Sequence, residues 1–539
     1  MTTLWYKNAI LYGLDIDKFQ DSNGDGWGDF PGALGRLDYL ADLGVTCLWL
    51  LPFYPSPHRD NGYDVVDYCA VDPRYGTLKD FQTFLAGARE RGIRILIDMV
   101  ANHTSDQHPW FQEARRDKTS KYHDYYIWAQ EPPEKSAHQP IFPGAENSVW
   151  HYDEVAGAYY FHIFYHFQPS LNHANPDVRA EFQRILKFWL DLGVDGFRID
   201  AAPHMIEPKD SPETIVPHPH DILREMSAFV RGQSPDAALL AEADGEPDEL
   251  PAFFGDGREM HLLFNFYLDN YLFLAFARRN ANTLGRVLTQ FPNIPREGQW
   301  ANFLRNLDEL DLERLTEDER QVVYAAFAPD EDMRIYNRGI RRRTAPMFGG
   351  NRRQMEMAYS LLFSLPGAPL VVYGDEIGMG DDLSQPERNS VRTPMQWADE
   401  LNGGFSTAPV SKLVRPVIDT GEFGYERVNV TDQQRDPDSF LNWMKRLIEI
   451  RKQNPQLGTE LCHVFDVGAP EVLAHQVQLD GHNLIALHNL SDKPLTVTLD
   501  VNDTLTEALA NQAYPALNHS REFSLPGFGY RWFRTVARR

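Results

Sequence analysis

The chain of 539 residues contains little cysteine and no long apolar run. Its three cysteines, Cys47, Cys69 and Cys462, stand far apart without a Cys-x-x-Cys pair, so neither a disulfide framework nor a cysteine-based zinc site is indicated. Apolar runs such as Leu48-Trp49-Leu50-Leu51 are far shorter than the ~20 residues of a membrane helix. The stretch from Met1 to Lys7 lacks the basic and apolar regions of a signal peptide. We therefore expect a cytoplasmic protein.

Basic residues are also in short supply. Lys and Arg number 52 against 77 Asp and Glu, which gives a formal net charge of −25. Nucleic acids and anionic membrane surfaces both attract basic proteins, so we expect neither as a partner. A neutral ligand such as a sugar is unaffected by this charge. Aromatic residues make up 12% of the chain, which is compatible with a sugar site and equally with a bulky core.

Short apolar runs alternate with helical patterns over about the first 450 residues. Strands are expected at 45–50, 93–98, 196–200, 239–242 and 369–373, and helices at 81–91 and 182–192. Buried parallel strands have such continuous apolar runs, and their alternation with helices indicates βα units. The chain length favours a (β/α)₈ TIM barrel over an open sheet.

The alternation is interrupted twice. Residues 104–175 are rich in His, Tyr, Trp and Pro and are too long for a plain loop, which indicates an inserted subdomain after the third strand, over the active site. From about residue 468, short strand-like runs are separated by turn residues. We therefore predict a catalytic barrel of residues 1–103 and 176–455, the insertion at 104–175, and an all-β C-terminal sandwich domain at 456–539.

Charged residues stand at the ends of four predicted strands. These groups are Asp98 to His103, Arg198 with Asp200, Glu242, and Arg305 to Asp308. In a barrel the C-terminal strand ends meet at one face, which carries the chemistry. Paired carboxylates suit retaining glycoside cleavage, in which one attacks the anomeric carbon and the other donates a proton. We expect Arg198 to keep Asp200 ionised and the apolar run before Glu242 to raise the pKa of that residue.

Taken together, these segments resemble the α-amylase superfamily of retaining α-glucosidases and transglucosidases. The resemblance rests on Asp98-Met99-Val100-Ala101-Asn102-His103, Gly196-Phe197-Arg198-Ile199-Asp200, Glu242 and Asn306-Leu307-Asp308 in the superfamily's order and spacing. Further segments resemble its trehalose-synthase branch, among them Thr104-Ser105-Asp106-Gln107-His108-Pro109-Trp110-Phe111 and Val391-Arg392-Thr393-Pro394-Met395-Gln396-Trp397. The resemblance runs from about residue 5 to residue 409.

The resemblance implies a role for eight residues. Asp200 would be the nucleophile, Glu242 the acid/base, and Asp308 the carboxylate that grips and distorts the reacting sugar. Residues implied to bind that sugar or to close its pocket are Tyr63, Asp64, His103, Arg198 and Arg392. Ala201, which follows the nucleophile, favours α-1,4 or α-1,1 linkages over α-1,6 linkages.

The implied activity is retaining processing of small α-glucosides through a covalent glucosyl-enzyme intermediate. Its most specific form is intramolecular transglucosylation that converts maltose into trehalose, with a disaccharide or short α-glucoside as substrate. An α-glucosidase or an intermolecular transglucosidase would use the same three carboxylates. A sugar phosphorylase would need a cationic phosphate site, and a non-catalytic carbohydrate-binding protein would have no reason to retain the trio.

A loop near the N-terminus has the residue types of a calcium site. Asp21, Asn23 and Asp25 alternate, and Asp29 completes a set of oxygen ligands of the kind Ca²⁺ prefers. Gly32 stands where an EF-hand has its bidentate glutamate, so the loop is not an EF-hand. The alternative is a series of solvated Asx turns. The resemblance implies a structural Ca²⁺ ion here, and we expect no organic cofactor.

The sequence departs from the superfamily pattern at two places. Leu307 stands where a histidine normally donates a hydrogen bond to the sugar, and Ser170 stands where close relatives have Asp. Either the pocket has drifted while keeping its glucoside, or it serves a different sugar or acceptor.

Replacing Leu307 by His tests these alternatives. A hydrogen bond involving a charged group contributes roughly 1.5–3 kcal/mol, which corresponds to about ten- to a hundredfold in rate. If the substrate is an ordinary glucoside, Leu307→His raises kcat/KM on maltose or trehalose. An unchanged or lower kcat/KM would instead indicate a pocket adapted to another sugar.

Overall fold

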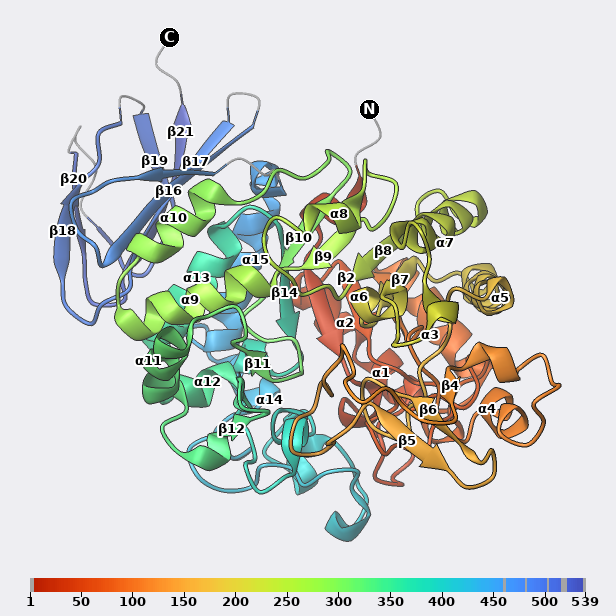
Figure 1. Ribbon diagram of the computed structural model, residues 1–539. Coiled ribbons are helices and arrows are strands. Elements are labelled where there is room, and N and C mark those ends of the chain that lie inside the picture. Colours follow the sequence, from red (N-terminus) through yellow and green to blue (C-terminus); the bar gives the residue numbers. More distant parts are fainter. Residues whose placement is uncertain (1–3, 459–461, 480–481, 502–503, 515–520, 537–539) are drawn as a thin grey trace.

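The computed structural model describes residues 4–458, 462–479, 482–501, 504–514 and 521–536. Parts of the predicted barrel domain (residues 1–3) and of the predicted C-terminal domain (residues 459–461, 480–481, 502–503, 515–520 and 537–539) therefore lie outside the described residues. Eight parallel strands form a closed barrel at the centre of the molecule (Figure 1). The barrel strands are β1 (Leu11–Leu14), β2 (Cys47–Leu50), β3 (Arg94–Met99), β7 (Gly196–Ile199), β8 (Ala238–Ala241), β9 (Leu262–Phe264), β10 (Gln299–Asn302) and β14 (Ala368–Val372).

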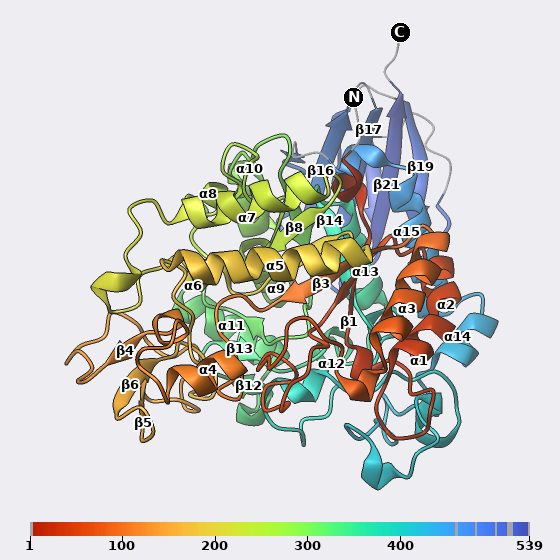
Figure 2. The same ribbon diagram turned by 90° about the vertical axis from the view of Figure 1, so that its right-hand side faces the viewer.

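Helices surround the barrel, as Figures 1 and 2 show from two sides. They are α1 (Phe30–Gly35), α2 (Leu37–Leu43), α3 (Leu78–Glu90), α5 (Pro176–Leu192), α6 (Ala202–Ile206), α7 (His220–Gln233), α8 (Pro251–Phe254), α9 (Phe266–Arg278), α10 (Asn282–Gln290), α11 (Glu317–Phe327), α12 (Thr344–Met347), α13 (Arg352–Ser364), α14 (Val430–Arg435) and α15 (Phe440–Lys452). None of the helices within the described residues is both long and apolar enough to cross a bilayer.

Local sequence signals set the limits of these elements. Thr77 and Asp80 form a capping box at the start of α3, with each side chain bonded to the other's backbone N–H. Helix α5 begins after Asn175, whose side chain caps it, and ends at Gly193 in the left-handed conformation that favours glycine. The predicted (β/α)₈ barrel is confirmed. Strands β1, β9 and β10 were not among the strand ranges expected from the sequence.

Two long excursions rise from the C-terminal ends of the barrel strands. The first follows β3 and contains α4 (Pro109–Ala114) and a sheet of β4 (Trp128–Ala129), β6 (Ala158–Phe161) and β5 (Trp150–Asp153). The second follows β10 and contains a small sheet of β11 (Leu310–Asp311), β13 (Gly339–Ile340) and β12 (Arg334–Ile335). The predicted insertion lies in the first excursion, whereas the sequence analysis did not foresee the second. The boundaries proposed at 103/104, 175/176 and 455/456 stay predictions.

The C-terminal region is all-β, as predicted. A five-stranded antiparallel sheet packs against a two-stranded one through a shared apolar core that includes Ile485, Val497 and Phe523. The strands are β15 (Cys462–Phe465), β16 (Val472–Leu479), β17 (His482–Asn489), β21 (Tyr530–Val536) and β19 (Thr504–Ala510) in the first sheet, and β18 (Leu495–Thr498) and β20 (Glu522–Leu525) in the second. On the barrel side, Trp532 Nε1 donates to Ser360 Oγ of α13 at 2.9 Å.

Candidate active site

A cavity lies at the C-terminal ends of the barrel strands and brings most of the predicted site residues together. Six of the eight line it, and the insertion contributes Ile141, Phe142 and Phe164 to its wall. The six are Tyr63, His103, Arg198, Asp200, Glu242 and Asp308. Arg198 lies in β7 itself and the other five lie just after β2, β3, β7, β8 and β10, so the barrel alone explains why residues far apart in the chain meet.

One buried guanidinium organises the floor of this cavity. Arg198 Nη1 donates to Asp98 at 2.8 Å and to Asp200 at 2.5 Å, and its Nη2 lies 2.7 Å from Glu242 Oε2. Asp98 and Arg198 are direct neighbours because β3 and β7 pair in parallel with these two residues in register. The guanidinium also lies 5.3 Å from the ring centre of Trp49, a cation–π distance. Three carboxylates therefore share one positive charge.

The pKa values of the three carboxyl groups reflect both their burial and the single guanidinium that they share. Burial raises the pKa of Asp200 to about 7, against the lowering effect of Arg198. Burial likewise raises the pKa of Glu242 to about 7 and that of Asp98 to about 6, and Arg198 again opposes both shifts. The expected upward shift of Glu242 is found. Arg198 lowers the pKa of Asp200, as expected, but burial outweighs it and the same cation also serves Asp98 and Glu242, so Asp200 is not kept fully ionised at neutral pH.

The backbone after β7 holds two of the carboxylates side by side. Ala201, directly after Asp200, has a φ of 46°, a left-handed value that non-glycine residues adopt at some energetic cost. In this conformation Ala201 N–H donates to Glu242 Oε2 at 3.0 Å, and Ala202 N–H donates to the Glu242 carbonyl at 3.0 Å. The turn therefore links the end of β7 to the end of β8 and fixes Asp200 next to Glu242.

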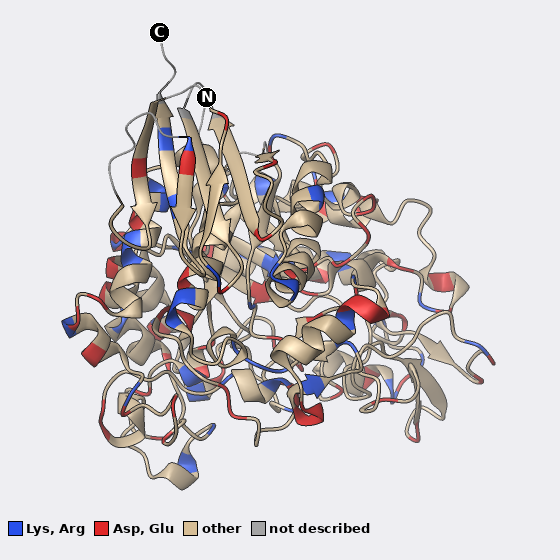
Figure 3. Ribbon diagram, turned by 90° about the vertical axis from the view of Figure 1, so that its left-hand side faces the viewer, with Lys and Arg blue, Asp and Glu red and all other residues tan. Residues whose placement is uncertain are grey.

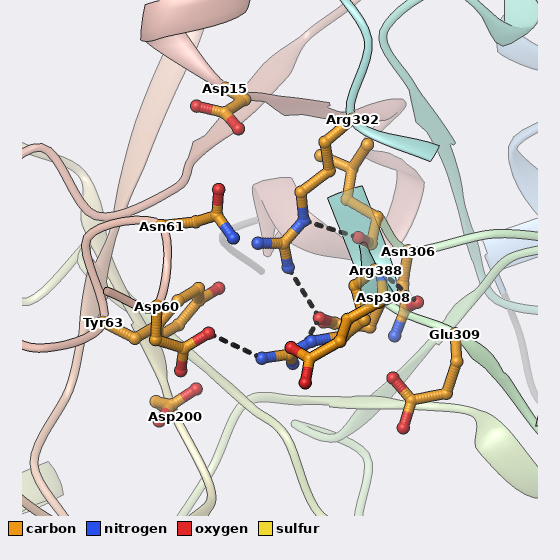
Figure 4. A network of polar contacts seen from close by, with 12 residues as sticks. Asp15, Asp60, Asn61, Tyr63, Asp200, Asn306, Asp308, Glu309, Arg388 and Arg392 are labelled. Atoms are coloured by element: carbon orange, nitrogen blue, oxygen red, sulfur yellow. Dashed lines mark hydrogen bonds and ion pairs between the residues drawn. The ribbon is translucent and has the colours of Figure 1, made fainter. Parts of the chain in front are cut away.

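Asp308 has a different electrostatic setting, which Figure 4 shows. Its Oδ1 lies 2.8 Å from Arg388 Nη1 and 2.7 Å from Arg392 Nη2. Although burial acts to raise the pKa of Asp308, Arg388 and Arg392 lower it below its ordinary value. Arg388 Nη2 also lies 2.8 Å from Asp60 Oδ1, so it bridges two cavity carboxylates. Asp308 is thus held ionised, whereas Asp200 and Glu242 compete for a proton.

Two predicted site residues lie behind the cavity wall. Asp64 is fully buried and accepts hydrogen bonds from Ser56 Oγ and from the Asp60 backbone, so it orders the loop that carries Asp60 and Tyr63. Arg392 is also fully buried; its Nε donates to the Leu307 carbonyl at 2.8 Å while its Nη2 holds Asp308. Both residues support others that face the cavity.

The two departures from the superfamily pattern are also buried. Leu307 is only 1% exposed and has a φ of 74°, so its side chain packs in the core while its carbonyl is held by Arg392. Ser170 is fully buried and forms an isolated antiparallel β-bridge with His103. Ser170 Oγ has no hydrogen-bond partner within the described part of the chain. Neither residue lines the cavity.

Sequence reasoning missed Asp60 and Arg388, which line the cavity and pair with each other. Each stands in a polar stretch where a charged residue is unremarkable: Asp60 lies four residues before Asp64, and Arg388 four before Arg392. The insertion was expected over the active site, but the contribution of the second excursion to the cavity roof was missed. Phe142 of the insertion packs on Tyr336 of the second excursion, with ring centres 4.8 Å apart, and Tyr165 Oη donates to Glu387 at 2.6 Å.

The candidate calcium loop is a series of Asx turns. The Oδ1 atoms of Asp21, Asn23 and Asp25 each accept the backbone N–H two residues further on, at 2.9–3.0 Å. Asp29 Oδ1 caps α1 by accepting Gly32 N–H at 2.7 Å, and its Oδ2 accepts from Ser22. All the side-chain atoms that could coordinate a metal here are oxygens, which Ca²⁺ prefers as ligands. Over the described ranges, however, no group of three or more His, Cys, Asp or Glu side chains is arranged as a metal site.

Comparison with known proteins agrees with this geometry. The model of the family described as "Alpha amylase, catalytic domain" matches residues 16–460, and that of "Sucrose hydrolase-like, C-terminal domain" matches residues 481–534. A trehalose synthase of a Pimelobacter species is 40% identical over 548 residues, covering 98% of this chain and 96% of that protein. A trehalose synthase/amylase of Mycobacterium tuberculosis is 40% identical over 542 residues, covering 98% of this chain and 90% of its own.

A solved structure adds to the comparison. The trehalulose synthase of Pseudomonas mesoacidophila superposes with a TM-score of 0.80 at 27% identity, covering 99% of this chain and 100% of that one. The match therefore includes the excursions and the C-terminal domain as well as the barrel. With a family model that spans most of the chain and relatives 40% identical over almost all of it, the protein belongs to the alpha-amylase family.

Proposed function

We propose that the protein is a retaining transglucosidase that interconverts maltose and trehalose. The observation that carries the proposal is the pairing of Asp200 and Glu242 on adjacent nitrogens of Arg198. It is supported by 40% identity over 98% of the chain to an enzyme named trehalose synthase. A retaining mechanism needs two close carboxyl groups, one ionised and one protonated. A pair whose pKa values both rise to about 7 meets this need at neutral pH.

The reaction would proceed in two displacements. Asp200 attacks the anomeric carbon of the non-reducing glucose of maltose, while Glu242 gives its proton to the departing oxygen. The freed glucose then turns within the cavity. Its anomeric hydroxyl attacks the glucosyl ester and returns its proton to Glu242, which releases Asp200 and forms the α-1,1 bond of trehalose.

The glucose unit that is transferred, the donor glucose, would be held by charged groups that do not take part in proton transfer. The freed glucose, the acceptor, would lie on its other side. Asp308, kept ionised by two arginines, can accept hydrogen bonds from ring hydroxyls and strengthen them as positive charge develops on the sugar. Asp60 and Arg388 stand beside it and offer an acceptor and a donor to the same ring. Tyr63 donates to Asp98 at 3.1 Å and presents its ring to the cavity.

An isomerase must keep water away from the glucosyl ester until the second attack. The cavity roof is suited to excluding water, because Phe142 of the insertion contacts Tyr336 of the second excursion directly. Arg338 of the second excursion also donates to the carbonyl of Ile141 at 3.0 Å. An α-glucosidase or intermolecular transglucosidase with a more open roof is the alternative. Phosphorolysis is disfavoured because carboxylates outnumber guanidinium groups along the cavity wall.

Two features stay as proposals beside the main one. We propose that Ca²⁺ orders the loop of Asp21, Asn23, Asp25 and Asp29, supported by its alternating oxygen donors. Treatment with a chelator would then lower Tm, and Ca²⁺ but not Mg²⁺ would restore it. Identical melting curves in chelator and in Ca²⁺ would mean that the loop is held by its Asx turns alone. A cytoplasmic location is likewise proposed from the sequence.

The function is tested by incubating the purified protein separately with maltose and with trehalose and following the anomeric protons by NMR. We expect each disaccharide to give the other with little free glucose. Asp200→Asn should lower the rate by about a thousandfold or more, because no ester can form. Asp256→Asn is the matched control, because Asp256 is an exposed aspartate that pairs with Arg258; it should leave the rate unchanged. Glucose as the main product would identify a hydrolase, and no reaction with either sugar would reject the proposal.

A further inference from the structure

One side of the cavity is lined by four carboxyl groups that the proposed reaction does not use. They are Asp244, two residues after the acid/base, and three groups that follow β10. The three are Glu309, Asp311 and Glu313. We call these four the acidic wall. In the proposed reaction Asp60, Asp308 and Arg388 hold the donor glucose, which leaves the acidic wall to face the departing or incoming acceptor.

Few positive charges balance the acidic wall. Arg338 lies 2.7 Å from Asp311 but also 3.8 Å from Glu313 and 3.9 Å from Glu309. Arg314 lies 3.3 Å from Asp244 and is shared with Glu313 and with Glu246 at the rim. These two guanidinium groups therefore serve five carboxyl groups, and Arg388, which already holds Asp308 and Asp60, also acts electrostatically on Glu309. Elsewhere basic and acidic residues are interspersed, as on the face in Figure 3, so the imbalance is local as well as part of the net charge.

Glu309 provides a second, independent observation. It is only 8% exposed, and its carboxyl group is turned inward toward the group that holds Asp308 (Figure 4). Its Oε2 atom finds no hydrogen-bond partner among the described residues, and the nearest guanidinium, that of Arg338, lies at 3.9 Å from Oε1. A buried carboxyl oxygen without a partner costs free energy unless a ligand satisfies it. The acidic wall thus contains one buried oxygen, Glu309 Oε2, that a hydrogen-bond donor on a ligand can satisfy.

We propose that the acidic wall selects acceptors that carry a protonated amine, such as amino sugars, and rejects anionic acceptors such as sugar phosphates. This inference rests on the proposed glucosyl transfer but not on the identity of maltose or trehalose. An ammonium group supplies three hydrogen-bond donors and a compact positive charge. It can satisfy Glu309 Oε2, as a neutral hydroxyl also can. In addition, its positive charge favours the ionised form of Asp244, whose pKa burial raises to about 7.

The amine takes part in binding and not in the bond rearrangement. A hydroxyl oxygen of the amino sugar attacks the anomeric carbon of the glucosyl–Asp200 ester. The carbon–oxygen bond to Asp200 breaks with its electron pair on the carboxylate, and the hydroxyl proton passes to Glu242. The products are a neutral glucosyl unit joined to an amino sugar that keeps its ammonium group, so no further reactant is needed.

The experiment uses a competition between acceptors, with α-glucosyl fluoride as a general donor. Equal concentrations of glucose and one amino sugar (2-amino-2-deoxyglucose or 6-amino-6-deoxyglucose) are present together, and the transfer products are quantified by mass spectrometry. Their ratio gives the relative kcat/KM of the two acceptors, even if the amine also inhibits the donor site. We expect at least one amine to be favoured about tenfold, which corresponds to about 1.4 kcal/mol.

Two further acceptors and three variants separate charge from shape. N-Acetylglucosamine, a neutral amide, should lose the preference of its parent amine, and glucose 6-phosphate should be used at least tenfold less than glucose. Asp244→Asn and Glu309→Gln should each bring the ratio of amine to glucose closer to one. Asp256→Asn, which removes an exposed carboxylate on Arg258 outside the cavity lining, should leave that ratio unchanged.

The outcomes are distinguishable from failure of the proposed function. An amine preference without maltose–trehalose interconversion would retain the acidic wall and reject only the isomerase. Equal use of amine and glucose, or unimpaired use of glucose 6-phosphate, would overturn the selectivity. If the fluoride is not consumed, calorimetric Kd values of the parent protein for 2-amino-2-deoxyglucose and N-acetylglucosamine replace the product ratio, and equal values overturn the proposal.

Discussion

The active site depends on one buried positive charge that three carboxyl groups share. Arg198 contacts Asp98, Asp200 and Glu242 within 2.8 Å; Arg198, Asp98 and Asp200 are buried, and Glu242 is partly buried at the cavity. Ionising all three acids would leave two uncompensated negative charges in a low-dielectric setting, which is costly. The group therefore retains a proton near neutral pH. A titration of this kind belongs to the whole group and not to any one residue.

The barrel supplies the geometry that this arrangement requires. Parallel pairing places Asp98 beside Arg198, and the left-handed turn at Ala201 brings the end of β7 against Glu242. Asp308 lies on the loop after β10, where Arg388 and Arg392 hold it ionised. The two excursions then close over this floor through aromatic contacts. The division between a rigid charged floor and a roof made of long loops is what lets one barrel host hydrolysis, transfer or isomerisation by changes in the loops.

The sequence predicted the parts that depend on local patterns. The alternation of apolar runs with helical patterns identified the (β/α)₈ barrel, and charged strand ends identified Arg198, Asp200, Glu242 and Asp308. The misses have a common cause, which is that they depend on contacts between distant segments. The sequence could not foresee that Asp64 points away from the cavity and Asp60 into it, or that Arg388 bridges Asp60 and Asp308. Nor could it foresee that Arg198 serves three carboxyl groups at once.

The pH dependence of kcat/KM, compared between the parent protein and Asp98→Asn, tests the shared charge most directly. Because burial raises the pKa values of Asp200 and Glu242 to about 7, the parent should give a bell-shaped profile centred near neutral pH. The acid limb reports loss of a proton by this group, in which the negative charge of Asp98 raises the pKa of Asp200. Asp98→Asn removes that charge, so its acid limb should move to lower pH. A flat profile from about pH 5 to about pH 9, or an acid limb that stays in place, would contradict the account.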